Sequence, residues 1–183
     1  IFILFTVINV SPLLSSNSTV PLHLPSIVQT NSILYHININ KKIQSLRMKT
    51  FTKFNVHDHE YAAYQYIYNL DIINMAKPIY YDPNQKILTT EYIDALNIAD
   101  EYTDDPNCVP DNIFEMIVDV INTLYQHNII YKDITGYNFI YHDEKIWLVD
   151  FEYVDFETNT NDFVKSFIKW TPNHPKQWNP EFL

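Results

Sequence analysis

Apolar residues recur at helical spacing in two long stretches of the chain. Residues 111–127 carry them at intervals of three and four, which predicts a helix about 25 Å long with one buried face. Residues 58–70 show the same periodicity, with Asp58 placed to cap the start and three tyrosines on one stripe, Tyr61, Tyr64 and Tyr68. A shorter helix is predicted over residues 162–169, and the prolines that follow it exclude a continuous helix in the tail.

Strand-like alternation marks several other segments. Residues 32–36 and 43–51 predict a hairpin around residues 40–42, and the alternation at 46–49 puts Arg47 and Lys49 on one face. Residues 78–81 and 87–93 predict two further strands, joined by a turn at 82–84. This order predicts an α+β fold, with a small N-terminal sheet lobe and a short helical C-terminal lobe that join near Ile93 and Asp94.

The first 40 residues contain no Asp, Glu, Lys or Arg. Residues 1–10 are apolar, but a membrane span needs about 20 such residues and a secretory signal begins with basic ones, so we expect neither. We expect residues 1–30 to form a poorly ordered extension. If translation starts at Met48, these residues are not part of the native protein. The alternative is that they form an anchor or targeting segment. The predicted folded domain covers residues 31–183, with the N-terminal lobe over 31–93 and a truncated C-terminal lobe over 94–183.

Composition narrows the classes of function. The 183 residues carry a formal net charge of −10, which argues against non-specific nucleic-acid binding, because that binding depends on clustered Lys and Arg. The one cysteine, Cys108, cannot form an internal disulfide, and this fits the reducing environment of an intracellular, cytoplasmic protein. The chain has a single glycine, Gly136, so no glycine-rich loop precedes it.

The clearest chemical pattern lies between residues 133 and 150. Asn138 follows Asp133 by five residues, and Asp150 comes at the end of the next apolar, strand-like segment. One carboxylate can orient an attacking hydroxyl, while an amide and a second carboxylate supply the hard oxygen ligands that Mg²⁺ prefers. The spacing therefore predicts a phosphoryl-transfer site. The alternative is structural: Asp133 and Asn138 form turns around Gly136, and Asp150 caps a strand.

The stretch from Ile113 to Phe151, which contains NIIYKDITGYNFIYHDEKIWLVDF, resembles the catalytic core of a protein kinase. By this resemblance Asp133 is the catalytic base, and Asn138 and Asp150 bind Mg²⁺. Thr135 stands where many protein kinases keep a lysine, in a pattern similar to the kinase of the KEOPS complex, and the chain is as compact as the RIO kinases. The resemblance implies a reduced two-lobed protein-kinase-like fold with ATP and Mg²⁺ as cofactors.

Residues 59–100 resemble the kinase segment that runs from the regulatory helix to the hinge between the lobes. The resemblance makes Glu60 the ion-pair partner of the nucleotide-binding lysine and places the stretch from Glu91 to Ile93 against the adenine. We assign that lysine to Lys49, eleven residues before Glu60, with Lys53 as the alternative. The resemblance also implies that Asp162 caps the final helix and binds the backbone of the catalytic loop; a plain N-cap is the alternative.

Departures from the kinase pattern leave three functions open. The glycine-rich loop is missing, and Glu152 replaces the glycine of the usual Asp-Phe-Gly, which makes the string similar to choline and ethanolamine kinases. The first hypothesis is an ATP- and Mg²⁺-dependent serine/threonine protein kinase of minimal type. The alternatives are a pseudokinase that only binds, and a kinase of small alcohols. By analogy with other small kinases, we expect a protein substrate and consider an obligate protein partner.

Overall fold

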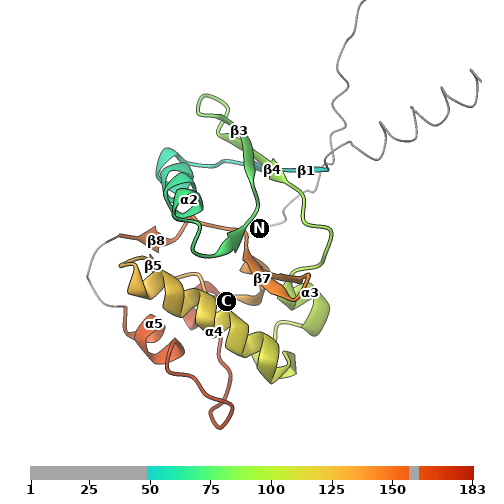
Figure 1. Cartoon of the computed structure of the whole chain (residues 1–183), viewed down its shortest axis with the longest axis vertical. Coiled ribbons are helices and arrows are strands. Elements are labelled where there is room, and N and C mark those ends of the chain that lie inside the picture. Colours follow the sequence, from blue (N-terminus) through green and yellow to red (C-terminus); the bar gives the residue numbers. More distant parts are fainter. Residues whose placement is uncertain (1–48, 157–160) are drawn as a thin grey trace, which may run out of the picture. The chain divides into compact units, whose positions relative to one another are not determined.

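The computed structural model describes residues 49–156 and 161–183. The chain divides into two units, Ile1–Thr50 and Phe51–Leu183, and nearly all described residues belong to the second. The predicted extension over 1–30 and the predicted strand over 32–36 lie outside the described residues. The elements are labelled in Figure 1.

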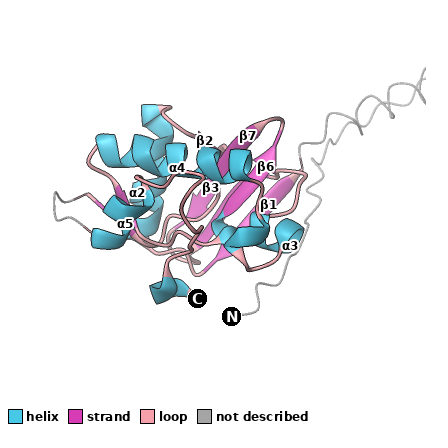
Figure 2. Ribbon diagram, turned by 90° about the horizontal axis from the view of Figure 1, so that it is seen from below, coloured by secondary structure: helices cyan, strands magenta, loops and turns pink. Residues whose placement is uncertain are grey.

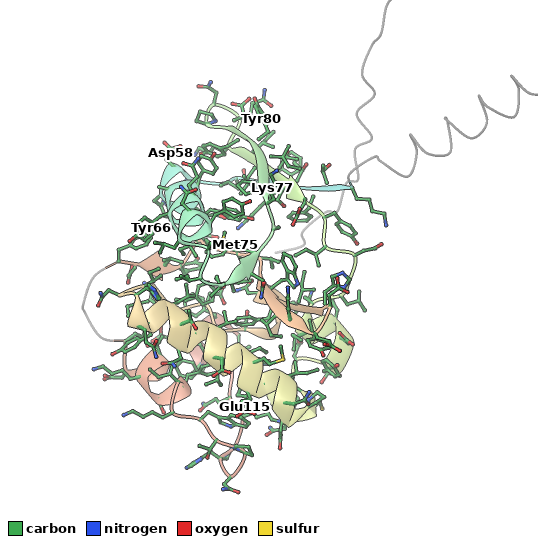
Figure 3. The ribbon with its side chains drawn as sticks, viewed as in Figure 1. Asp58, Tyr66, Met75, Lys77, Tyr80 and Glu115 are labelled. Atoms are coloured by element: carbon green, nitrogen blue, oxygen red, sulfur yellow. The ribbon has the colours of Figure 1, made fainter. Side chains whose placement is uncertain are left out.

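Three strands form the first sheet, in the order β1-β4-β3. They are β1 (Thr50–Phe54), β3 (Pro78–Asp82) and β4 (Ile87–Glu91). The two strands predicted over 78–81 and 87–93 are confirmed, although β4 ends at Glu91: β3 and β4 pair antiparallel, and Asp82 Oδ1 accepts the backbone N–H groups of Asn84 (2.9 Å) and Gln85 (3.0 Å) in the turn between them. Figure 3 labels Tyr80 on this hairpin. The turn of the other predicted hairpin, at 40–42, lies outside the described residues.

Helix α2 (Asp58–Leu70) covers the residues predicted for it. Its buried residues follow helical spacing: Glu60, Ala63, Tyr64 and Ile67. The predicted cap is wrong, because the N-cap residue is His57. Asp58 is the first residue of the helix and accepts a hydrogen bond from the Tyr81 hydroxyl at 2.8 Å, which ties the start of α2 to β3. The helix ends at Leu70, and the C-cap residue Asp71 has a left-handed backbone with φ 52°.

Helix α4 (Asp111–Gln126) is the longest helix that the structure describes, and it organises the core. The predicted face is buried at Ile113, Ile117, Ile121 and Leu124, whereas Met116 and Val120, also expected there, are half-buried; Phe114 and Val118 are buried beside it. Burial of each such side chain contributes roughly 1.5–3 kcal/mol. The helix packs against β5 (Ile130–Tyr131) and β7 (Lys145–Leu148). Among residues 49–156 and 161–183, no helix is long and apolar enough to cross a membrane.

Short strands place the segment after α2 beside the strand that precedes Asp150. β6 (Phe139–His142) and β7 form an antiparallel hairpin, and β2 (Asn74–Met75) pairs in parallel with β7, with Met75 opposite Leu148. Figure 2 shows β2, β7 and β6 together. β5 pairs with β8 (Val154–Asp155), on the other side of Asp150 in sequence. These pairings hold Asp150 between two fixed strands.

The remaining elements are short. They are α3 (Ile98–Tyr102), α5 (Asp162–Phe167) and the 3₁₀ turns η1 (Pro106–Cys108), η2 (Gly136–Asn138) and η3 (Pro180–Phe182). The predicted cap of the last helix is wrong by one residue, because Asn161 Oδ1 accepts the Val164 N–H at 3.1 Å. The Asp162 side chain is 98% exposed and lies 3.8 Å from Lys165 Nζ, so it does not bind the catalytic loop.

Candidate active site

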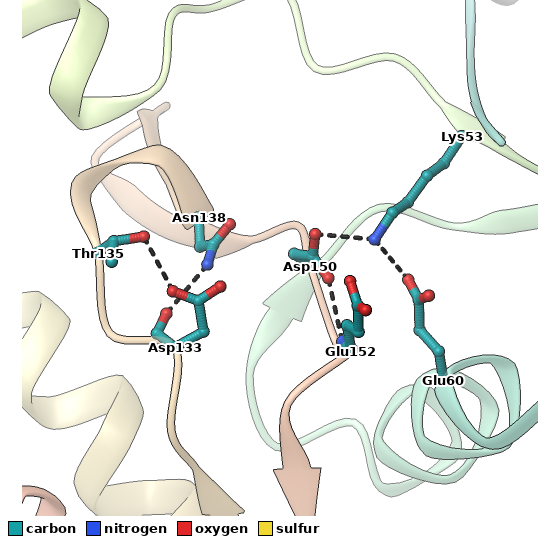
Figure 4. A network of polar contacts seen from close by, with 7 residues as sticks. All are labelled: Lys53, Glu60, Asp133, Thr135, Asn138, Asp150 and Glu152. Carbon is teal, nitrogen blue, oxygen red and sulfur yellow. Dashed lines mark hydrogen bonds and ion pairs between the residues drawn. The ribbon is translucent and has the colours of Figure 1, made fainter. Parts of the chain in front are cut away.

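Lys53 joins β1 to two other parts of the chain. Its Nζ lies 2.6 Å from Glu60 Oε1 on α2 and 2.8 Å from Asp150 Oδ2, just after β7 (Figure 4). The Glu60 side chain is only 2% exposed, against 20% for Lys53. A buried carboxylate is costly unless it is paired, and here one ammonium group serves two carboxylates. The neighbouring elements β1 and α2 therefore meet the segment after β7, which is 97 residues from Lys53 in sequence, at one cluster of charges.

This cluster corrects the expected partner of Glu60. Lys53, the alternative, forms the ion pair that the sequence analysis gives to Lys49, and its binding of nucleotide stays a prediction. Lys49 is exposed, and at about 3.3 Å per residue of strand it lies about 13 Å before Lys53 along the chain. The alternation cannot distinguish the two lysines, because residues four apart share one face of a strand. Only the lysine nearer α2 reaches Glu60.

Asp133 lies in a loop stabilised by its own hydrogen bonds. Its Oδ1 accepts from the Thr135 hydroxyl at 3.2 Å, and its backbone carbonyl accepts from Asn138 Nδ2 at 3.0 Å. Because the amide nitrogen of Asn138 is used in this way, the amide oxygen is the atom left to bind a cation. In Figure 4 Asp133, Asn138 and Asp150 lie next to one another. The structure thus brings together the three residues that the spacing singles out.

Aromatic packing fixes the backbone on both sides of Asp150. Phe151 is buried, and its ring contacts Tyr64 of α2 at 4.9 Å and Tyr131 of β5 at 6.4 Å between centroids. The Asp150 side chain also accepts the Glu152 N–H, at 3.0 Å. These edge-to-face ring contacts therefore connect α2 to the strand that leads into Asp133.

The site contains four carboxylate side chains, Glu60, Asp133, Asp150 and Glu152, and one ammonium group, that of Lys53. Burial raises the pKa of Asp133, and the nearby charges of Asp150 and Glu152 raise it further. Burial also raises the pKa of Glu60, despite its ion pair. Burial lowers the pKa of Lys53, but its two carboxylate partners outweigh that effect and the net shift is upward. A carboxylate with a raised pKa is a stronger base, which suits proton transfer near neutral pH.

The oxygen donors fit Mg²⁺ bound together with a nucleotide. Within the described residues, no group of three or more His, Cys, Asp or Glu side chains is arranged to hold a metal ion. Mg²⁺ does not need such a group, because it is usually bound through one or two protein carboxylates, with water and phosphate oxygens as its other ligands. The Asp150 carboxylate and the Asn138 amide oxygen are suitable donors, and the surplus of negative charge around Lys53 favours a cation.

The predicted hinge residues follow the first sheet. Glu91 ends β4, and its N–H donates to the Lys77 carbonyl at 2.9 Å; Ile93 is half-buried two residues later. Their contact with adenine stays a prediction. Glu91 also lines a pocket, together with Tyr68, Asp71, Ile73, Asn74, Met75, Lys77 and Trp147. Figure 3 labels two of the residues that line it, Met75 and Lys77. Lys53, Glu60 and Asp150 are not among the residues that line this pocket.

The single glycine lies where the loop of Asp133 and Asn138 touches α3. A Cβ atom added to Gly136 would come within 3.1 Å of the Ala99 backbone nitrogen and 3.2 Å of its Cβ. These contacts are close enough that the neighbouring backbone must move. The glycine therefore lets the loop that carries Asp133 and Asn138 pack directly on the helix that follows the hinge.

We expect Gly136→Val to destabilise the protein by about 1–3 kcal/mol, because a larger side chain overpacks this contact. Chemical denaturation followed by tryptophan fluorescence measures the effect. The control is Lys145→Val, at an exposed position of β7 that accepts a β-branched residue. Equal stability of the two variants would show that the close approach at Gly136 does not matter.

A family model described as a RIO domain matches residues 29–163. The match includes α2, the catalytic loop and the segment around Asp150, and it extends over most of the chain. The chain belongs to the RIO-domain family. Membership of this family confirms the predicted protein-kinase-like superfamily. It also confirms the predicted kinase-like α+β fold. No curated protein matches it by sequence.

Three solved structures are similar to the RIO-domain chain. The PK-1 kinase of Cydia pomonella granulovirus is 14% identical with a TM-score of 0.46, over 61% of this chain and 45% of that protein. The Rio2 kinase of Chaetomium thermophilum, solved as an ADP/Mg²⁺-phosphoaspartate complex, is 15% identical with a TM-score of 0.48, over 67% and 42%. Rv3197 of Mycobacterium tuberculosis, solved with erythromycin, is 16% identical with a TM-score of 0.41, over 52% and 26%. The chain spans less than half of each of these proteins.

Proposed function

We propose that this RIO-domain chain is an ATP- and Mg²⁺-dependent phosphotransferase that acts on serine or threonine in an intracellular protein. The contact that carries the proposal is the ion pair of Lys53 with both Glu60 and Asp150, next to the loop of Asp133 and Asn138. Phosphoryl transfer depends on positioning and charge stabilisation, with little covalent chemistry by the protein. A lysine held between a helix and a metal-binding aspartate supports both requirements.

Each residue of the cluster has a proposed role. Lys53 binds the phosphates of ATP, and Glu60 orients Lys53. Asp150 and Asn138 hold Mg²⁺, which neutralises charge on the phosphates when it is bound. The backbone from Glu91 to Ile93 contacts the adenine.

In the proposed reaction, Asp133 accepts a hydrogen bond from the acceptor hydroxyl. It takes the proton of that hydroxyl as the oxygen bonds to the γ-phosphorus of ATP, and the bond from that phosphorus to the bridging oxygen of ADP breaks. Thr135 orients the carboxylate through its 3.2 Å hydrogen bond. A positioned base of this kind typically contributes about 10²–10⁴-fold to the rate.

Two features support other functions. No glycine precedes Gly136, and without glycine the backbone approaches phosphates less closely, which favours a domain that only binds nucleotide. Glu152 places a further carboxylate beside Asp150, and the string from Asp150 to Tyr153 resembles kinases of choline and ethanolamine. A small cationic alcohol is therefore the second candidate acceptor.

An acceptor screen separates these functions. Purified protein is incubated with Mg²⁺ and ATP plus serine/threonine peptides, choline, ethanolamine or sugars, and ADP release is followed together with thermal stabilisation by ATP. The proposal predicts peptide-dependent ADP release. Stabilisation without ADP release would favour the binding domain, and release only with choline or ethanolamine would favour the alcohol kinase. If ATP does not stabilise the protein and no acceptor leads to ADP release, all three functions are contradicted.

A further inference from the structure

The C-terminal segment, residues 176–182, is anchored in the core of the molecule. Trp178 is fully buried, with its ring 5.4 Å from Phe114 of α4 and 6.5 Å from Phe139 of β6. The Phe182 ring lies 4.9 Å from Tyr153. The segment therefore contacts the longest helix, the strand after the catalytic loop and the chain that follows Asp150.

Asn179, in the middle of this segment, binds the catalytic loop on both sides of Asp133. Its side chain is fully buried, and its Nδ2 donates to the Lys132 carbonyl at 2.7 Å. Its backbone N–H donates to the Ile134 carbonyl at 2.9 Å. One residue thus holds the peptide groups before and after the proposed base.

Asn179 is also held in place from its other side. Its Oδ1 accepts the Glu181 N–H at 3.2 Å, and its carbonyl accepts the Phe182 N–H at 3.1 Å, so it caps the 3₁₀ turn η3. A buried amide needs all of these partners, since each unsatisfied polar group costs about 1–3 kcal/mol. The position is therefore specific for a side chain with one donor end and one acceptor end.

We infer that Asn179 is a positioning residue for the catalytic loop. It acts through the backbone of Lys132 and Ile134 to hold Asp133 toward the acceptor, and it makes the contact that the kinase resemblance gives to Asp162. This inference rests on the proposed function of Asp133. It lies outside the family match, which ends at residue 163.

The test compares Asn179→Ala and Asn179→Asp with Lys176→Met. Asn179→Asp preserves the size and the acceptor of the side chain but removes the donor to Lys132. Lys176 lies in the same segment, and its Nζ contacts Asp111 Oδ1 at 2.6 Å and the Val109 carbonyl. Both partners are distant in sequence from the loop of Asp133. Lys176→Met is therefore expected to loosen the C-terminal segment without removing a contact to that loop. Hydrogen–deuterium exchange of residues 130–138 and the kinetics of ADP release with a peptide acceptor are the two measurements.

We expect both Asn179 variants to exchange the loop amides roughly tenfold faster than Lys176→Met, because one strong hydrogen bond to the loop is lost. We expect kcat to fall at least tenfold with the KM for ATP within about twofold of wild type, since the nucleotide contacts do not include Asn179. Loop exchange and kcat that change no more than in Lys176→Met would overturn the inference. If Asn179→Ala does not fold, Asn179→Asp decides. If the wild-type protein releases no ADP, the proposed function fails, and hydrogen exchange alone decides whether Asn179 positions the loop.

Discussion

Asp133→Asn is expected to lower the rate of phosphoryl transfer by about 10²–10⁴-fold, the usual contribution of a positioned general base. The amide still fits the loop and can still accept the hydrogen bond from Thr135, but it cannot take a proton. Nucleotide binding should be largely retained, because the proposed phosphate and metal contacts come from Lys53, Asn138 and Asp150. Initial rates of ADP release and an ATP titration measure the two effects separately.

The same substitution is expected to raise the melting temperature at neutral pH. The pKa of Asp133 is raised in the folded protein by burial and by neighbouring carboxylates, so the folded state favours the protonated, neutral form. The stabilisation from that protonation is present at low pH and is lost as the pH rises from the unfolded pKa through the higher folded pKa. An amide has no charge at any pH. The gain in stability should therefore shrink as the pH falls toward the ordinary aspartate pKa.

The control is Asp143→Asn, which removes a carboxylate that is 80% exposed at a hairpin turn, where a left-handed backbone (φ 50°) also suits asparagine. This variant should leave both rate and stability unchanged. Full activity of Asp133→Asn would contradict the role of base. A lower melting temperature for Asp133→Asn would contradict the raised pKa.

Lys53→Met is expected to abolish transfer, while Lys49→Met leaves it near the wild-type rate. Lys53 pairs with Glu60 and Asp150, and Met preserves the length of the side chain without its charge. Lys53→Met should also destabilise the protein by about 3 kcal/mol, the lower end of the range for a buried ion pair that loses one partner. The low end applies for two reasons. The Lys53 side chain is 20% exposed, and Glu60, whose pKa is raised, can take up a proton and become neutral when its partner is lost.

The double variant Lys53→Met with Glu60→Gln separates stability from activity. It removes the unpaired buried carboxylate, so the melting temperature should recover while transfer stays absent. Thermal denaturation and ADP release are measured on the wild-type protein, Lys53→Met, Lys49→Met and the double variant. If Lys49→Met loses activity and Lys53→Met does not, the sequence-based assignment of Lys49 is correct and the structural one is wrong.

Local patterns in the sequence predict the elements and the catalytic loop well. Helices α2 and α4 follow from apolar spacing because their buried faces have the helical period. Asp133 and Asn138 are close in sequence, and Asp150 follows one hairpin later, so their meeting depends on short-range structure. Residue-level caps are harder to predict, because neighbouring polar residues such as Asn161 and Asp162 can each serve.

Contacts between distant segments are the part that the sequence does not predict. Alternation would put Lys49 and Lys53, four residues apart, on the same face of a strand, and only the ion pair with Glu60 of α2 selects Lys53. Asn179 precedes a proline, which predicts a turn, but nothing local indicates that its side chain binds the Lys132 carbonyl. Such contacts depend on how the whole chain folds.

The most direct measurement is isothermal titration of ATP into wild-type protein and Asp150→Asn, each in Mg²⁺ and in EDTA. If Asp150 and Asn138 hold a cation beside Lys53, wild type binds ATP at least about tenfold more tightly in Mg²⁺, because the ion offsets the repulsion between the phosphates and the acidic cluster. Asp150→Asn should lose most of that difference. Equal affinity of wild type in Mg²⁺ and EDTA, or an unchanged Mg²⁺ effect in Asp150→Asn, would contradict the proposed metal–nucleotide site.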